Sequence, residues 1–306
     1  MEVVKFKFYA TLLDAYQNYL DSDIIWSKYW GWSENPPHTP EEFKKIQFQS
    51  LIDKINRVPF DSEAADKGTA FNEVIDCMVL HRNSENMEIH TIYQDVEDYH
   101  YVGEGEVKPY NKRVPIGVEA KLNGRSFYFP IQLVRHYAAY YKGALPQVYI
   151  QAVLPTMYGK VMLYGYIDYL MPFCTHDLKT TRQYAVGNYK RHWQHKVYPY
   201  ALMKNGCDVY DFEYNISEIG KTYYRNYTES YTFSPERDIP LLTQHCEGLI
   251  SFIQENRDLI TDKKIFNLVK YGRRKEHQYR CTPRKGCATG GKQRNYRSAY
   301  HEYQRG

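Results

Sequence analysis

The chain has 306 residues, of which 43% are hydrophobic and 25% are charged, and its formal net charge is +4. These values lie in the ordinary range of soluble globular proteins, and the length permits one large or two small domains with an ample core. The sequence shows no signal-peptide pattern and no apolar run of about 18 residues, which argues against a membrane-spanning class and predicts a cytoplasmic protein.

Two amphipathic helices are predicted near the N-terminus. Apolar and aromatic residues repeat at helical spacing over residues 7–20, and an aromatic loop interrupted by prolines follows. Thr39 has the features of an N-cap, with a proline at the first helical position and Glu42 completing a capping box, so a second helix is expected over residues 40–56. We therefore expect residues 1–60 to form an N-terminal helical region that packs against the core or shapes a channel.

Further elements are expected before the middle of the chain. They are a helix over residues 67–80, a polar stretch over 81–114, a hairpin over 116–132, a short helix over 133–143 and a strand over 148–155. The hairpin is predicted from its Asn123-Gly124 pair, which favours a two-residue turn.

The middle of the chain has the pattern of two strands joined by a tight turn. The apolar run at residues 161–170 is rich in β-branched and aromatic residues, and Pro172 marks the turn that follows. With the turn at this position, Asp168 lies opposite Asp177, at a Cβ separation of about 5 Å. Two carboxylates so placed repel each other unless a cation lies between them, and a divalent cation with oxygen ligands fits this role.

Lys179 projects to the same face as Asp177 because strand side chains alternate with a period of two, and His176 projects to the other face. Metal-binding carboxylates with an ammonium beside them are what phosphodiester hydrolysis requires, since a water must be ionised and the negative charge that develops on the phosphate must be stabilised. Taken singly, these residues are more often ordinary strand charges. However, Asp168 follows a run that is apolar on both faces, and buried charges are rare unless they are paired or bound to metal.

A helix is expected over residues 188–205. Gln194 and Tyr198 lie four residues apart on one face of it, near enough to the strand pair to hold a phosphate or a base. His195 lies about 100° round the helix from Gln194, so a phosphate contact by His195 is an open alternative. Pro199 removes a backbone hydrogen bond and favours a kink that would move Tyr198.

The C-terminal part is predicted to complete the sheet and to end in a basic segment. Strands are expected over residues 207–216 and 221–233, followed by a helix with an apolar stripe from Leu242 to Ile253. Residues 263–306 carry 13 Lys and Arg against two glutamates, a net charge of +11. Because this segment lacks apolar periodicity, we expect a flexible tail that either binds single-stranded nucleic acid or has no function.

The order of these features resembles the PD-(D/E)XK nuclease superfamily, and within it the RecB-type and phage exonuclease branch. The matching elements are the Gly-Tyr-Ile-Asp run ending at Asp168, the Asp177-Leu178-Lys179 triplet as the D/E-x-K element, and residues 194–198 as the Q-x-x-x-Y element. The resemblance spans roughly residues 68–202. It implies an α/β (α+β) fold with a restriction-endonuclease-like core over residues 61–262, in which helices flank a central mixed β-sheet, between the N-terminal helical cap and the basic tail.

The resemblance also implies Mg²⁺ or Mn²⁺, held by Asp168, Asp177 and the backbone carbonyl of Leu178. The first motif of the branch is a glycine followed four residues later by a histidine, and here Gly68 is followed by Asn72. Asparagine binds metal more weakly than imidazole or a carboxylate, so Glu73 is expected as a further metal ligand by a narrow margin over Asn72. The two side chains lie about 100° apart on a helix, so we expect only one of them to face the ion.

The six cysteines contain no C-x-x-C pair, so buried thiols in a reducing compartment are the simplest interpretation. Some RecB-type nucleases hold a four-cysteine iron–sulfur cluster, and Cys281 and Cys287 match part of such a spacing. Without a close cysteine pair, an iron–sulfur cluster is disfavoured.

The resemblance implies a metal-dependent DNA exonuclease of DNA recombination, repair or end processing, encoded by a phage and acting in the bacterial cytoplasm. Lys179 would help to deprotonate the attacking water and stabilise the developing charge, while Gln194 and Tyr198 orient the DNA. A single-strand annealing or recombination protein is the implied partner. Two alternatives stay open: a structure-specific or restriction-type endonuclease on the same core, and a non-catalytic nucleic-acid-binding protein, since the chain has 32 tyrosines.

Overall fold

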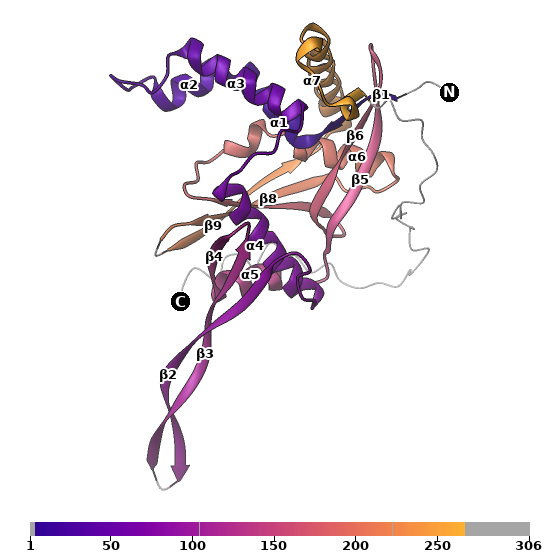
Figure 1. Ribbon diagram of the computed structural model, residues 1–306. Coiled ribbons are helices and arrows are strands. Elements are labelled where there is room, and N and C mark those ends of the chain that lie inside the picture. The colour runs from indigo at the N-terminus through magenta and orange to yellow at the C-terminus, as the bar shows by residue number, and fades with distance from the viewer. Residues whose placement is uncertain (1–3, 104, 222, 267–306) are drawn as a thin grey trace, which may run out of the picture. The chain divides into compact units, whose positions relative to one another are not determined.

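The computed structural model describes residues 4–266, with the exception of residues 104 and 222 (Figure 1). These residues belong to one compact unit and form two β-sheets and seven α-helices, in agreement with the predicted α/β (α+β) class. Within the described ranges, none of the helices combines the length and hydropathy of a membrane span. Most of the predicted basic tail, including Cys281 and Cys287, lies outside the described residues.

The main sheet is organised around strand β6. Its strands are β1 (Val4–Tyr9), β5 (Leu145–Thr156), β6 (Gly159–Leu170), β7 (Cys174–Thr181), β8 (Asp211–Ile219) and β9 (Tyr224–Thr232). Strand β5 pairs antiparallel with β6 along its whole length and so occupies one edge of β6. On the other edge, β1 runs parallel to residues 160–164, and β7 runs antiparallel to residues 169 and 170. Residues 165–168 of β6 therefore lie between two partner strands, at a fork in the sheet.

The strand register places the two central carboxylates together. Tyr169 pairs with His176, which is the register predicted from a turn at Pro172. Continued by one residue, this register sets Asp168 opposite Asp177, at the point where β7 leaves β6 to pair with β8 in parallel. Strand β9 then pairs antiparallel with β8, as expected for strands that extend the sheet.

A second, antiparallel sheet consists of β2 (Glu88–Gly103), β3 (Glu106–Leu122) and β4 (Arg125–Pro130). The Asn123-Gly124 turn is confirmed, and both residues have positive φ. Strands β2 and β3 form a long ribbon that extends past β4 (Figure 1), where only a polar stretch was expected. Most of its side chains are exposed on both faces, so the ribbon lacks the alternation of apolar and polar residues that predicts a half-buried strand.

The helices pack against the two sheets and form two separate hydrophobic cores with them. They are α1 (Ala10–Leu20), α2 (Ser22–Trp30), α3 (Pro40–Ile55), α4 (Glu63–Leu80), α5 (Ile131–Tyr140), α6 (Gln194–Lys204) and α7 (Pro235–Glu255). One core joins α1, α3, α6 and α7 to the main sheet, and the predicted apolar stripe of α7 is fully buried in it. The other core joins α4, α5 and the second sheet to Tyr169 and Leu178.

The N-terminal region departs from the expected all-helical form. The capping box of α3 at Thr39 and Glu42 is confirmed, but the loop before it contains helix α2. Residues 4–9 form strand β1 because Phe6 and Phe8 alternate with lysines and are buried, which is the period of a strand. Strand β1 and helices α1 and α3 are therefore part of the main sheet and its core.

Two other boundaries differ from expectation. The helix predicted over residues 188–205 is divided into a 3₁₀ turn, η1 (Asn188–Arg191), and α6, which begins at Gln194. After η2 (Arg257–Leu259), the first four residues of the predicted tail form η3 (Lys263–Phe266). Ile265 of η3 is fully buried in the core, so the fold continues past residue 262.

Candidate active site

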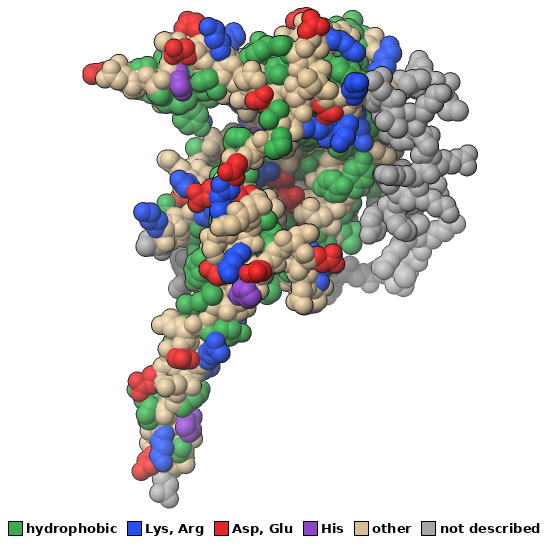
Figure 2. Space-filling view, viewed as in Figure 1, with side chains coloured by type: hydrophobic (Ala, Val, Ile, Leu, Met, Phe, Trp, Pro, Cys, Tyr) green, Lys and Arg blue, Asp and Glu red, His purple; other side chains and the backbone are tan. Residues whose placement is uncertain are grey.

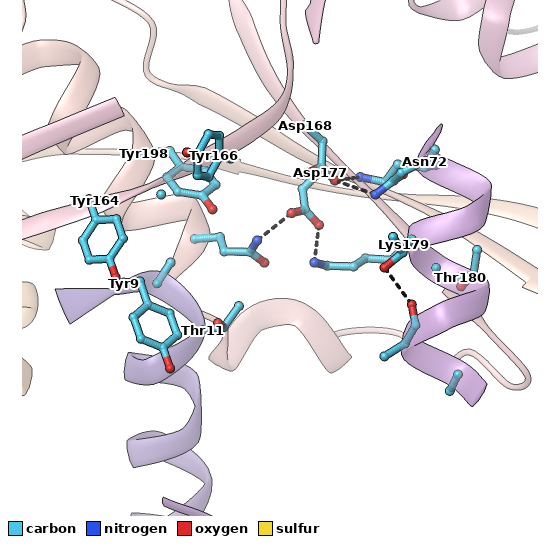
Figure 3. Close-up of a pocket in the computed structure, with 18 of the residues that line it drawn as sticks. Tyr9, Thr11, Asn72, Tyr164, Tyr166, Asp168, Asp177, Lys179, Thr180 and Tyr198 are labelled. Atoms are coloured by element: carbon cyan, nitrogen blue, oxygen red, sulfur yellow. Dashed lines mark hydrogen bonds and ion pairs between the residues drawn. The ribbon is translucent and has the colours of Figure 1, made fainter. Parts of the chain in front are cut away.

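A cavity of about 530 Å³ opens at the fork in the main sheet. Its walls come from β6, β7, α4 and α6 and from the junction of β1 with α1. In the space-filling view this face is hollowed between α1 and α4, with charged side chains inside the hollow (Figure 2). Seven residues predicted for the site line it together: Asn72, Asp168, Asp177, Leu178, Lys179, Gln194 and Tyr198. All of them except Leu178 and Gln194 are labelled in Figure 3.

Asp168 bridges β6, β7 and α4. Its Oδ2 accepts a hydrogen bond of 3.0 Å from the backbone N–H of Leu178 and one of 3.4 Å from Asn72 Nδ2. Because the N–H and C=O of one residue in a strand point to the same edge, the carbonyl of Leu178 also lies on the side of Asp168. Burial and the nearby charge of Asp177 raise the pKa of Asp168, so the ionised form is disfavoured unless a cation is present.

Asp177 is held by two partners. It is 1% exposed, its Oδ1 accepts a 2.6 Å hydrogen bond from Gln194 Nε2, and its Oδ2 forms a 2.6 Å ion pair with Lys179 Nζ. Burial alone would lower the pKa of Lys179, but the carboxylates of Asp177 and Asp168 more than offset this effect and raise it. Lys179 therefore remains an ammonium at neutral pH, pointing into the cavity (Figure 3).

Several buried oxygens of the cavity lack a hydrogen-bond donor. Asn72 Oδ1 and Gln194 Oε1 accept no hydrogen bond from any described residue, and Asp177 Oδ2 has only its ion pair with Lys179. Buried acceptors are ordinarily satisfied, so this group has the character of a site for a positive ligand. Oxygen atoms of Asp168, Asp177, Leu178 and Asn72 are the ligand type that Mg²⁺ and Mn²⁺ prefer, and they fit the predicted metal.

The structure reverses the expected order of the two residues on α4. Asn72 faces the cavity and contacts Asp168, whereas Glu73 does not line the cavity. Both carboxylate oxygens of Glu73 accept hydrogen bonds from Arg82, at 2.8 and 3.0 Å. The preference for Glu73 as a ligand is corrected by this geometry, because the helix turns the two side chains in different directions. Gly68, one turn earlier on α4, also lines the cavity.

Helix α6 places Gln194 and Tyr198 in the cavity even though Pro199 lies inside the helix. The Tyr198 ring packs closely on Gly165 of β6, where a Cβ atom would lie 2.6 Å from Tyr198 Cε1. His195 does not line the cavity. Its ring is buried and stacks on Tyr231, so the alternative of a phosphate contact by His195 finds no support in the geometry.

Sequence reasoning missed the residues that line the other end of the cavity. Tyr9, Tyr164 and Tyr166 lie there, away from Asn72 (Figure 3), and Tyr166 is exposed. Arg57 is the second cation of the lining, and its guanidinium donates a 2.9 Å hydrogen bond to the Tyr164 hydroxyl. Arg57 has a positive φ, but this backbone angle cannot be read from the sequence, so no sequence pattern indicated that Arg57 belongs to the site.

Comparisons with known proteins add little to this geometry. No family model matches the sequence, and no curated protein matches it either. Four chains of solved structures match, one of which is described as "Crystal structure of SSO0001". It is 9% identical, the match covers 82% of this chain and 79% of that chain, and the TM-score is 0.38. A likeness this low carries no argument, so any assignment of function depends on the site itself.

Proposed function

We propose that the protein is a divalent-metal-dependent deoxyribonuclease that hydrolyses phosphodiester bonds, and that it acts as an exonuclease. One observation carries this proposal: Asp168, Asp177 and Lys179 line one cavity in which buried acceptor oxygens lack donors. Two carboxylates beside a fixed ammonium are what metal-assisted phosphodiester hydrolysis needs. The preference for DNA ends follows from the resemblance to the PD-(D/E)XK nucleases and their RecB-type and phage exonuclease branch.

Asp168, Asp177 and the Leu178 carbonyl would hold one or two Mg²⁺ or Mn²⁺ ions, with Asn72 as a weaker ligand. When bound, the metal supplies a nucleophile at neutral pH and stabilises the charge that develops on the phosphate. Gln194 fixes one oxygen of Asp177 through its 2.6 Å hydrogen bond, which leaves the other oxygen facing Lys179. Gln194 therefore acts first as a positioning residue for Asp177, in addition to the DNA contact predicted for it.

Of the two roles expected for Lys179, the metal-free site favours stabilisation of charge over help in deprotonating the water. The raised pKa of Lys179 keeps it protonated, and its ammonium lies 2.6 Å from Asp177. A phosphate that enters the cavity would meet this ammonium where negative charge accumulates in the transition state. Arg57 provides a second positive group at the tyrosine-lined end, where bases can stack on exposed rings such as Tyr166.

The test is a cleavage assay on linear and covalently closed circular DNA, with Mg²⁺ and with EDTA. We expect linear DNA to be degraded only with Mg²⁺ and closed circles to be spared. Asp177→Asn and Lys179→Gln should each lower the rate by on the order of 100-fold or more. Asp208→Asn is the matched control, since Asp208 is exposed and does not line the cavity.

Two other results of this assay would each favour one of the alternative functions. Cleavage of the closed circles would indicate the structure-specific or restriction-type endonuclease. DNA binding without cleavage, unchanged by EDTA and by Asp177→Asn, would indicate the non-catalytic binding protein and would refute the proposal.

A further inference from the structure

The face of β7 opposite the cavity carries a second group of metal-binding side chains. Cys174 and His176 lie two residues apart on β7, so they project to the same face. Parallel pairing with β8 sets His176 beside Glu213. It also sets Cys174 beside Asp211. Two neighbouring strands thus present four side chains of ligand type in one patch, on the side of the sheet that α5 covers.

Three of these side chains are close enough to share an ion. One ligand atom from each of Cys174, His176 and Glu213 lies within 4.8 Å of the others. Tetrahedral zinc, with bonds of about 2.0 to 2.3 Å, sets its ligand atoms roughly 3 to 4 Å apart, so small side-chain rotations would close the site. His176 is buried, while Cys174 and Glu213 are partly exposed and leave a route for an ion to enter.

We propose that Cys174, His176 and Glu213 bind a Zn²⁺ ion that ties β7 to β8 behind the candidate active site. A thiolate, an imidazole and a carboxylate are the ligands of zinc, whereas Mg²⁺ and Mn²⁺ prefer the oxygen atoms of the cavity. Water completes the fourth position. The ion would stabilise the strand that carries Asp177, the neighbour of His176, so its role is structural and independent of the proposed nuclease activity.

The surrounding hydrogen bonds suit a ligand set. The Tyr140 hydroxyl donates a 2.8 Å hydrogen bond to Glu213 Oε2, and His176 Nδ1 lies 3.1 Å from Asn215 Oδ1. The Tyr140 contact is the kind of outer partner that orients a ligating carboxylate in metal sites. His176 Nδ1 also lies 3.5 Å from Glu213 Oε2, so this nitrogen already faces the carboxylate with which it would share the ion.

The test is a titration of the reduced full-length protein with Co²⁺, a spectroscopic substitute for Zn²⁺. A thiolate ligand produces a sulfur-to-cobalt charge-transfer absorption, which the oxygen ligands of the cavity do not. We expect this absorption in the parent protein and its loss in Cys174→Ser. Cys77→Ser is the matched control, because the Cys77 thiol lies 3.5 Å from Glu73 Oε1 but belongs to no group of three ligand side chains among the described residues. The double variant Cys281→Ser/Cys287→Ser should also keep the absorption.

Glu213→Gln provides a second measurement that does not depend on a thiol. Glutamine keeps the acceptor for Tyr140 but loses the charge, so we expect the Kd for Zn²⁺ to rise on the order of 10- to 100-fold. The increase in Tm on adding Zn²⁺ to the parent should shrink accordingly. A parent protein that retains no Zn²⁺ and shows no charge-transfer absorption would overturn the proposal, as would absorption that persists in Cys174→Ser.

Discussion

The backbone N–H of Leu178 donates a 3.0 Å hydrogen bond to Asp168 Oδ2, across the fork where β7 leaves β6. The strand ladder between β6 and β7 has only two residue pairs, and this side-chain bond extends it by one step. Asp168 thus holds the strand that carries Asp177 and Lys179. The ionised form of the same carboxylate is disfavoured, since burial and Asp177 both raise its pKa.

Asp168→Asn should separate stability from activity. The amide oxygen can still accept the hydrogen bond from Leu178, while the cost of burying an ionisable carboxyl beside Asp177 disappears. In metal-free buffer at neutral pH we expect the free energy of unfolding to increase by about 1 kcal/mol, and DNA cleavage to be lost. Thermal unfolding in EDTA and the cleavage assay measure the two effects. A lower Tm for Asp168→Asn would show that burying the Asp168 carboxyl beside Asp177 does not destabilise the folded protein.

Substitutions on α4 test which of its two polar residues serves the site. Asn72→Ala removes the contact with Asp168 and should raise the Mg²⁺ concentration that half-maximal cleavage requires by roughly 3- to 10-fold. Glu73→Gln weakens the ion pair with Arg82, so we expect a loss of stability of at most about 1 kcal/mol and a nearly unchanged Mg²⁺ requirement. A larger shift for Glu73→Gln than for Asn72→Ala would restore the order expected from the sequence.

Gly165→Ala should act on the site through Tyr198. The new methyl group would lie 2.6 Å from Tyr198 Cε1, so the ring must move, at a cost of roughly 1 to 3 kcal/mol in the free energy of unfolding. We expect cleavage to fall with it. In a Tyr198→Leu background the same substitution should cost much less, and urea unfolding of the four proteins measures this coupling. If the losses of unfolding free energy from Gly165→Ala and Tyr198→Leu are additive, the Tyr198 ring does not restrict the space at Gly165.

Arg57→Gln should weaken DNA binding without changing the metal requirement. Arg57 and Lys179 are the two cations of the lining, and loss of one phosphate contact lowers the slope of log Kd against log salt by about 1. Fluorescence anisotropy at several salt concentrations measures this slope. Lys45→Gln, an exposed lysine of α3, is the control. Because Arg57 also forms a 2.7 Å ion pair with Asp262, Tm is recorded for both variants.

We expect His245 to lower the stability of the folded protein in mild acid. Burial lowers its pKa to about 4, and its ring stacks on Trp193 at a centroid distance of 3.9 Å. Between the unfolded pKa near 6.5 and about 4, the unfolded chain binds more protons, so stability falls as the pH decreases. Linkage predicts a loss of about 2 kcal/mol from His245 between pH 7.5 and pH 5. Urea unfolding of the parent and of His245→Gln at both pH values tests this, since the variant should lose less.

The part of the site that could be predicted depends on local periodicity. Asp177 and Lys179 share a face because a strand alternates, and the turn at Pro172 sets Asp168 opposite Asp177. These relations need only about a dozen neighbouring residues. The order of Asn72 and Glu73 could not be predicted in this way, because it depends on how α4 is rotated against β6 by tertiary packing.

Long-range relations explain the remaining differences. The pairing of β1 with β6 joins residues about 155 positions apart, and the sequence of the short β1 segment does not indicate which strand it pairs with. Arg57 reaches the cavity because α3 packs on α1 and the chain after α3 lies beside Tyr164. The β2–β3 ribbon escaped prediction because burial, which creates the alternating pattern of most strands, is slight there.

The three-partner arrangement of β6 has a consequence for the order of folding. Strand β1 is synthesised before its partner and can pair only after residues 160–164 have been made. The cavity wall at Tyr9 and Thr11 is therefore absent from shorter nascent chains. We expect a chain stalled before β6 to leave β1 unpaired, so the cavity would be complete only late in synthesis.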